Sequence, residues 1–409
     1  MEMMEPGPAL VNGLGYVGTG KRGSDTCPPD VITSILTEAR QTPPPANTLG
    51  AFFGGLWMKG VANEELAFEA LLGQGALKDS QALLSYFSQG VPKKVLQQTK
   101  ELMDGKIMNR AEAREMGEFL FSDSPGDSLR TLIATILRVR YASPEEYAGL
   151  LDVIASQYPP AFCEPVPEGK PIIQLAEPFD GVERSWILTP ILMRDLTELG
   201  YRVVALCGRN PGPKKGYNLL DVAESLAESR FLKSNSQLGE ENSYGWFLRQ
   251  SDVAPSLDRW VEIRHQMKKR PSLATLEKYV SPFKADIFIG SAFHHNFGDK
   301  MGEIGECLKI PKVIVTFKTV EGSLGPSLGR ATKIFTSDLE SSGEYRHEEF
   351  DFKVEDFGLT NTPDPKDFTP GLEKNCELIR NYFATGESGD AYFDQRVTAA
   401  REMLSRVLG

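Results

Sequence analysis

Long apolar runs are missing from this 409-residue chain. No stretch of about 18 apolar residues occurs, so the sequence predicts no membrane span. The amino terminus, MEMMEPGPAL, also lacks the basic start and apolar core of a secretory signal. It is not rich in Arg and Ser either, although a removed organelle transit peptide stays open as an alternative.

Cysteine is scarce and unpatterned. The five cysteines are odd in number, widely scattered and never spaced as CxxC. This pattern makes a zinc site or a disulfide framework improbable. We therefore expect the cytoplasm or another reducing compartment. The cysteines are Cys27, Cys163, Cys207, Cys307 and Cys376.

Positive charge is in deficit, but unevenly. The net charge is −11, and residues 337–409 hold 16 acidic against 8 basic side chains. That leaves only −3 for the first 336 residues, so a basic face elsewhere is possible. The balance argues against a protein that coats nucleic acid over its whole surface.

The first residues carry a weak phosphate-binding pattern. Residues 15–22, GYVGTGKR, match the spacing of a P-loop, but Arg22 stands where magnesium chemistry needs Ser or Thr. No strand is predicted before them, and Pro28-Pro29 follow soon after. We expect residues 1–27 to form a flexible lead-in.

Residues 28–160 are predicted to form an all-helical bundle, because amphipathic segments recur throughout. Within them LWMKGVANEELA (56–67) aligns without gaps on LRVRYASPEEYA (137–148), at an offset of 81. This echo indicates a duplicated helical unit, 28–90 and 94–157, or chance similarity between amphipathic hairpins. The expected helices cover 30–40, 47–58, 63–72, 94–104, 109–121, 129–140 and 144–157.

A hinge at 161–170 is predicted from its proline and glycine content, and an α/β domain from 171 to 409. Strands alternating with helices imply a doubly wound, mostly parallel sheet. The expected strands are 171–176, 202–207, 285–290, 312–317 and 331–336. The expected helices are 188–199, 219–228, 255–268, 272–280, 298–308, 373–384 and 391–407.

The stretch 170–216 is the best candidate site, because it predicts strand, glycine turn, helix and strand. Doubly wound sheets bind ligands beyond the carboxyl ends of their strands, where both glycine loops lie. One loop has carboxylates and an arginine, and the other has cations that suit a phosphate or simply aid solubility. Candidate ligand- or phosphate-binding residues, including some at later strand ends, are Glu177, Asp180, Gly181, Arg184, Ser185, Thr189, Gly208, Arg209, Asn210, Lys214, Lys215, His294 and Lys318.

Segment 255–284 is basic, with seven cationic residues against three acidic ones. Such a patch suits a nucleic-acid backbone, although an ordinary charged helix face is nearly as good an explanation. Aromatic residues are thin there, so base stacking is not well supported. The candidate nucleic-acid patch is Arg264, Lys268, Lys269, Arg270 and Lys278.

Four motifs follow one another in the second half of the chain: FDGVE (179–183), ILTPI (187–191), RPSLATLEK (270–278) and VEGS (320–323). They resemble Y-N-G-A-R, N-L-T-P-L, R-N-S-A-H-T-L-V-K and T-E-G-E of the anthranilate phosphoribosyltransferase family, most of all of its YbiB-like paralogues. The resemblance covers roughly 95–400. The resemblance implies a helical bundle, a phosphoribosyltransferase-type α/β domain and a homodimer through the helical domain.

Departures from the family motif bear on function. The biosynthetic enzyme grips the diphosphate of phosphoribosyl pyrophosphate with a G-T-G-G-D turn, where this chain reads AEPFD (176–180). Its magnesium-holding Asp-Glu pair is reduced to Glu321, a possible Mg²⁺ ligand if the protein is a transferase. A departing diphosphate needs neutralising charge. We therefore expect a binder of a phosphate-bearing or nucleic-acid ligand in the interdomain cleft and on the basic face, with an active phosphoribosyltransferase as the alternative.

Overall fold

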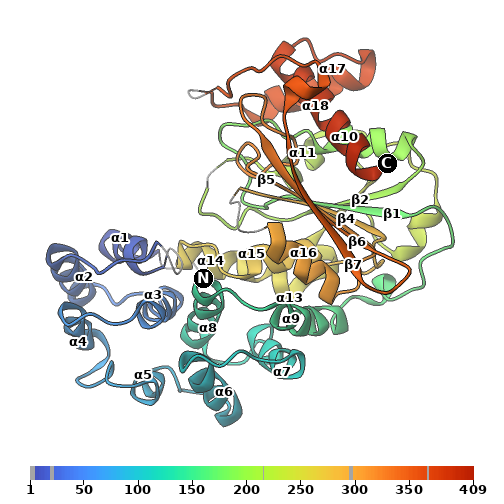
Figure 1. Cartoon of the computed structure of the whole chain (residues 1–409). Helices are drawn as coiled ribbons and strands as arrows, with labels where there is room; N and C mark the ends of the chain where they lie inside the picture. Colours follow the sequence, from blue (N-terminus) through green and yellow to red (C-terminus); the bar gives the residue numbers. More distant parts are fainter. Residues whose placement is uncertain (1–4, 19–22, 215, 294–297, 366–367) are drawn as a thin grey trace. The chain divides into compact units, whose positions relative to one another are not determined.

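The computed structural model describes every residue except 1–4, 19–22, 215, 294–297 and 366–367. The chain divides into two compact units (Figure 1). The helical unit comprises Met1–Val153, Pro211–Pro213 and Arg259–Leu276. The sheet unit comprises Ile154–Asn210, Lys214–Asp258 and Glu277–Gly409. No helix in the described part of the chain combines the length and the apolar character that spanning a bilayer requires.

The helical unit forms because its segments bury one apolar stripe each. Residues expected to be a flexible lead-in include helix α1, whose Leu10, Leu14 and Val17 are buried. Over residues 8–17 that prediction was wrong, because the Gly and Pro content concealed an apolar stripe. The helices are α1 (Pro8–Val17), α2 (Pro29–Gln41), α3 (Ala46–Lys59), η1 (Glu64–Phe68), α4 (Glu69–Leu72), α5 (Ser80–Tyr86), α6 (Lys93–Met103), α7 (Arg110–Leu120), α8 (Asp127–Arg140), α9 (Pro144–Ser156), α14 (Trp260–Met267) and α15 (Leu273–Leu276).

Two copies of one helical repeat make up much of this unit. Helices α3 and α8 both have 14 residues, and their bounds differ by 81 at each end. In the first copy buried Glu65 accepts the backbone N–H of Cys27 and Ala62 and pairs with Lys59. In the second, Glu146 accepts those of Met108 and Ser143 and pairs with Arg140. Every partner is shifted by 81, which favours duplication over chance.

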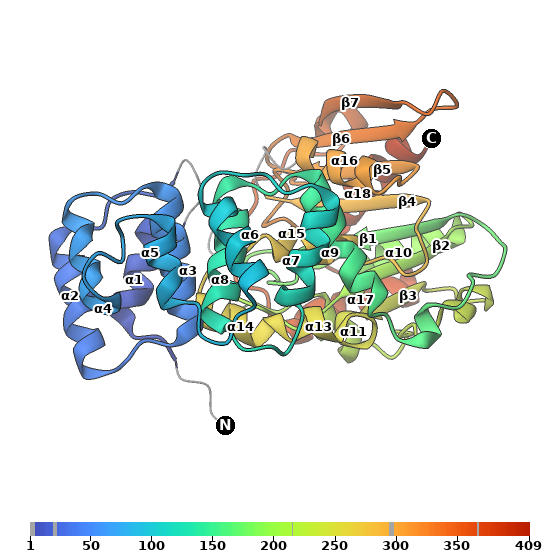
Figure 2. The ribbon, with the colours of Figure 1, turned by 90° about the horizontal axis from the view of Figure 1, so that it is seen from below.

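Helices α3 and α8 lie side by side (Figure 2). Glycines of α3 allow them to approach closely. A Cβ on Gly50 would lie 2.3 Å from the hydroxyl of Thr131, and one on Gly54 would lie 3.2 Å from Cβ of Thr135. Each glycine thus faces the residue 81 positions later, its own counterpart. A surface that meets its counterpart in this way is an isologous contact, as in a two-fold dimer.

The sheet unit contains one seven-stranded sheet in the order β3-β2-β1-β4-β5-β6-β7. β3, β2, β1, β4 and β5 are parallel, and β6 and β7 run antiparallel at one edge. The predicted doubly wound, mostly parallel sheet is therefore confirmed. The strands are β1 (Ile172–Ala176), β2 (Arg202–Cys207), β3 (Trp246–Arg249), β4 (Ile287–Ala292), β5 (Lys312–Phe317), β6 (Thr332–Leu339) and β7 (Tyr345–Phe352).

Alternate residues of these strands point to opposite faces of the sheet and pack against different helices. Ile289, Ile314 and Ile334 join the main core with α10 (Thr189–Glu198), α11 (Leu219–Ser225), α17 (Leu372–Thr385) and α18 (Ala391–Leu408). On the other face Phe288 stacks on Tyr279 of η4 (Glu277–Tyr279), and helix α16 (Gly298–Cys307) packs on β4, β5 and β6. The sheet is consequently held between two helical layers.

Several predicted elements differ from the structure. The helix expected over 255–268 is broken into α13 (Pro255–Asp258) and α14, and that over 272–280 shortens to α15 and η4. Strands β3 and β7 were not predicted. β3 has only four residues, and the sequence of β7, YRHEEFDF, is too charged to read as a strand because β7 is an exposed edge.

Candidate functional site

Three loops meet at the carboxyl edge of the parallel sheet, and the first two are bound together by main-chain contacts. Residues 177–188 follow β1, the loop after β2 reaches residue 218, and residues 318–331 follow β5. Val182 and Tyr217 form an antiparallel bridge, with a 2.9 Å hydrogen bond from N–H of Val182 to O of Tyr217. Gly181 has φ +72°, and a Cβ there would lie 2.2 Å from O of Tyr217, so glycine is required.

Asn218 fixes the second loop against the first. Its side-chain amide donates to O of Phe179 at 2.8 Å and to O of Gly208 at 2.9 Å. Its Oδ1 accepts from the first turn of α11 and caps that helix. Asn210 adds a 2.9 Å bond to O of Gly216. Asn218 was not predicted as a site residue, although an N-cap signal precedes α11.

Glu321 connects the third loop to the first. Its Oε2 accepts the backbone N–H of Glu183 at 2.9 Å and of Arg184 at 2.6 Å. Its Oε1 lies 3.2 Å from Nζ of Lys214. Glu321 has φ +56° and Lys318 has φ +60°, a conformation that costs roughly 1–3 kcal/mol per non-glycine residue. The contacts of Glu321 hold this strained loop in place.

Glu177 is turned into the protein. It is 4% exposed, and the hydroxyl of Thr189 donates to its Oε1 at 2.6 Å. Burial raises the pKa of Glu177, while hydrogen bonds from Thr189 and the backbone of Leu324 and the charges of Lys278 and Arg396 oppose that rise. The prediction that Glu177 and Thr189 face a ligand was wrong, because their polar groups are used on each other.

Arg396 of α18 holds two of the loops together and was not predicted as a site residue. It is 0% exposed. Its guanidinium donates to Oγ of Ser185 at 2.7 Å and to O of Gly325 at 3.1 Å. Burial lowers its pKa, an effect opposed by nearby acidic groups. Ser185 is therefore buried beneath the loop surface rather than facing a ligand as predicted.

The predicted cations of these loops differ in their surroundings. Arg209 forms an ion pair with Asp258 at 2.9 Å, and Lys214 pairs with Glu321. Exposed Arg184 and partly exposed Lys318 have no ion-pair partner within the described part of the chain. Asp180 is 4% exposed. Lys215 and His294 lie outside the described residues.

Arg330 is a further cation of the third loop that sequence reasoning missed. It is exposed and donates to O of Thr319 at 3.1 Å. Its guanidinium also lies over the ring of Phe293, 5.9 Å from the centroid. Arg330 therefore adds positive charge beside Lys318.

The candidate nucleic-acid patch does not form one exposed surface. Arg264 is 3% and Lys278 5% exposed, and Nζ of Lys278 donates to O of Ser291 at 2.5 Å. Lys268 is paired with Glu5, and burial lowers the pKa of Lys269. Arg264 and Lys278 were wrongly assigned to the patch, because the charge count carries no information on burial.

The loops do not offer Mg²⁺ a ready ligand set. Both carboxylate oxygens of Glu321 are engaged, one by backbone N–H groups and the other by Lys214. Mg²⁺ requires near-octahedral oxygen ligands at about 2.0–2.1 Å. Across the described residues, no group of three or more His, Cys, Asp or Glu side chains could hold a metal ion. The residues present therefore do not fit the predicted magnesium site.

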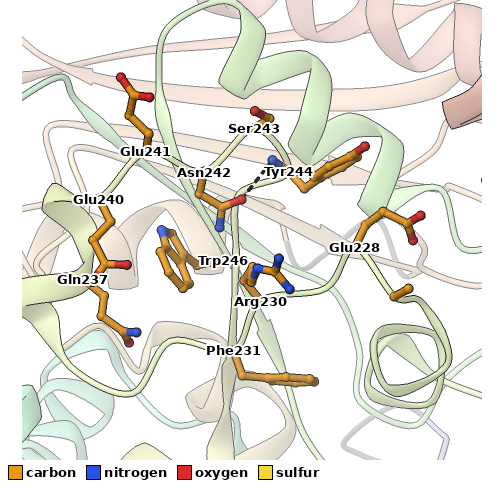
Figure 3. A pocket seen from close by; sticks show the side chains of 11 residues that line it. Glu228, Arg230, Phe231, Gln237, Glu240, Glu241, Asn242, Ser243, Tyr244 and Trp246 are labelled. Atoms are coloured by element: carbon orange, nitrogen blue, oxygen red, sulfur yellow. Dashed lines mark hydrogen bonds between the residues drawn. The ribbon is translucent and has the colours of Figure 1, made fainter.

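Two hollows lie at the opposite, amino-terminal end of the strands. One has a volume of about 600 Å³ and is lined by Trp246 and Tyr244. Figure 3 shows its lining side chains, which include the carboxylates of Glu228, Glu240 and Glu241. Arg230 is the one cation among its lining residues. The second, of about 460 Å³, shares the segment 240–243. The acidic lining disfavours a phosphate there.

Similar folds occur in solved anthranilate phosphoribosyltransferases. The enzyme from Thermus thermophilus is 18% identical, with a TM-score of 0.56, over 75% of this chain and 94% of the other. The enzyme from Saccharomyces cerevisiae, in complex with PRPP and Mg, is 14% identical, with a TM-score of 0.60, over 77% of this chain and 87% of the other. At this identity the likeness shows the fold alone, and it confirms the predicted fold class.

Sequence comparison adds little about function. An uncharacterized protein of Aquifex aeolicus (strain VF5) is 24% identical over 228 residues, which cover 56% of this chain and 67% of that protein. No family model matches the chain. The loop geometry therefore carries the functional argument.

Proposed function

We propose that the chain binds a phosphate-bearing small molecule at the strand-end loops of a phosphoribosyltransferase-type fold. The observation that carries this proposal is the pair Arg184 and Lys318, cations with no ion-pair partner among the described residues. They lie on the two loops that Glu321 connects. Arginine and lysine bind phosphate through charge-assisted hydrogen bonds, and this edge of a parallel sheet is the usual place for a ligand.

A phosphate-bearing small molecule fits these observations better than a nucleic acid. A polynucleotide requires a row of accessible cations along its backbone. Arg264 and Lys278 are buried, and Lys268 is neutralised by Glu5. The likeness in fold to an enzyme in complex with PRPP and Mg gives further support to a ligand that ends in phosphate.

Calorimetric titration of the full chain with inorganic pyrophosphate tests the proposal. We expect binding by the unaltered protein and at least about a tenfold loss of affinity in Arg184→Gln/Lys318→Gln, equivalent to about 1.4 kcal/mol. Lys309→Gln is the matched control, because Lys309 is exposed and lies before β5 at the opposite edge. No binding by the unaltered protein, or equal binding by the double variant, contradicts the proposal.

An active phosphoribosyltransferase is the second candidate, favoured by the likeness in fold. It would move ribose 5-phosphate from PRPP to an aromatic amine with Mg²⁺. Because Glu321 is already engaged, we expect no release of pyrophosphate above background from PRPP, Mg²⁺ and anthranilate. Release that depends on Glu321 would favour the transferase.

Self-association and nucleic-acid binding stay predictions. Sedimentation of the purified chain checks the expected homodimer through the helical unit. Titration with a labelled oligonucleotide at two salt concentrations checks the expected nucleic-acid binding, because binding to a phosphate backbone weakens steeply with salt.

A further inference from the structure

The ammonium group of Lys214 lies in a cage of oxygen atoms. Its Nζ is 3.2 Å from O of Gly181, 3.2 Å from Oε1 of Glu321 and 3.4 Å from O of Glu321. The three oxygens come from two different loops. An ammonium group has three N–H donors, so each oxygen can accept one of them.

Carbonyl and carboxylate oxygens are also the ligands of hard divalent cations. A lysine side chain and a metal ion cannot share one such cage, because like charges a few ångströms apart repel strongly away from bulk water. The side chain of Lys214 is 21% exposed and that of Glu321 17%, so solvent screens this repulsion only in part.

Glu321 is held in a fixed orientation toward Lys214. Its second carboxylate oxygen accepts the backbone N–H of Glu183 and Arg184. The orientation of this carboxylate is therefore fixed in part by backbone contacts that do not involve the lysine.

We propose that Lys214 is the resident counter-charge of the candidate phosphate site, in the place where a divalent metal ion would otherwise bind. This inference rests on the proposed function for the ligand class, a phosphate monoester or diphosphate that binds without metal. Lys214 supplies one fixed positive charge, offset in part by Glu321, and Arg184 and Lys318 add positive charge on the same two loops. Glu321 orients Lys214 rather than binding a metal.

Titration of the full chain with Mn²⁺ alone tests the cage without any phosphate ligand. We expect no site-specific Mn²⁺ binding by the unaltered protein. Lys214→Ala, where the oxygens are released, should bind Mn²⁺ at least about tenfold more tightly than the detection limit for the unaltered protein. Lys214→Ala/Glu321→Gln should lose that gain. The inference is overturned if the unaltered protein binds Mn²⁺ and Glu321→Gln abolishes that binding. It is also overturned if folded Lys214→Ala shows no gain in Mn²⁺ affinity.

The metal dependence of pyrophosphate binding tests the same inference on the unaltered protein, and so does not require Lys214→Ala to fold. Pyrophosphate affinity of the unaltered protein should change less than about twofold between EDTA and millimolar Mg²⁺, after correction for the metal complex of pyrophosphate itself. A requirement for Mg²⁺ overturns the inference. If pyrophosphate does not bind under either condition, the proposed function fails, whereas the Mn²⁺ titration still decides the role of Lys214.

Discussion

The two copies of the helical repeat keep the same polar contacts while other positions differ. Glu65 and Glu146 are both 0% exposed and hold the same corner of each copy. Around them the apolar and helix-end residues change: Cys27 corresponds to Met108, and Gly60 to Tyr141. In both copies a buried carboxylate, its paired cation and two backbone N–H groups hold the turn after the long helix. The volume of the surrounding side chains differs between the copies.

The largest effect is expected from loss of these carboxylates. Glu65→Gln and Glu146→Gln should each lower the free energy of unfolding by about 3–5 kcal/mol, because each removes a buried carboxylate that pairs with a largely buried cation and accepts two backbone N–H groups. Urea unfolding of the full chain measures both. Glu64→Gln and Glu145→Gln are neighbouring controls outside the buried corner and should change little. If only one of the two variants lost stability, Glu65 and Glu146 would not play equivalent roles in the two copies.

A smaller effect is expected at the contact between the copies. Gly50→Ala should destabilise by about 1–3 kcal/mol, because the new Cβ would lie 1.8 Å from the backbone oxygen of Ser128. Gly15→Ala is the matched control in another helix, since nothing lies within 4 Å of its Cβ position. Equal stability of the two variants would contradict close packing of α3 on α8.

The helix ends should respond more weakly and unequally. Gly60 and Tyr141 both have positive φ, +94° and +65°, directly after α3 and α8. Gly60→Ala should lose about 1–2 kcal/mol, because an L side chain is strained there. Tyr141→Gly relieves the same strain, but the added glycine also raises the entropy of the unfolded chain, and the two effects oppose each other. We therefore expect the free energy of unfolding to change by less than about 0.5 kcal/mol. Thermal unfolding of both variants checks the asymmetry.

The smallest effect on stability at neutral pH is expected from Cys27. Its counterpart in the second copy, Met108, is not ionisable. Burial, together with Glu65, raises the pKa of the Cys27 thiol from 9.0 to about 12. The unfolded chain therefore loses this proton before the folded one, and stability should fall as pH rises from about 9 to about 12. Cys27→Ala should remove that part of the alkaline decline, measured by urea unfolding at several pH values. An unchanged pH profile would contradict the assignment.

Local patterns predicted most of the fold and little of the site. The bounds of β2 and β5 agree with prediction because short apolar β-branched runs are typical of buried parallel strands. The Lys214–Glu321 pair joins residues 107 apart, and Arg396 reaches Ser185 across 211. No local pattern encodes such contacts. Nor does a charge count separate buried Lys278 from exposed Arg184.

The facing of Gly50 with Thr131 and of Gly54 with Thr135 has an evolutionary consequence. In an association of identical subunits, every substitution on the symmetry axis appears twice and must be compatible with itself. Here the two sides are encoded separately, so a glycine on one side can accommodate a threonine on the other. A substitution on one helix therefore need not be matched by the same substitution on the other.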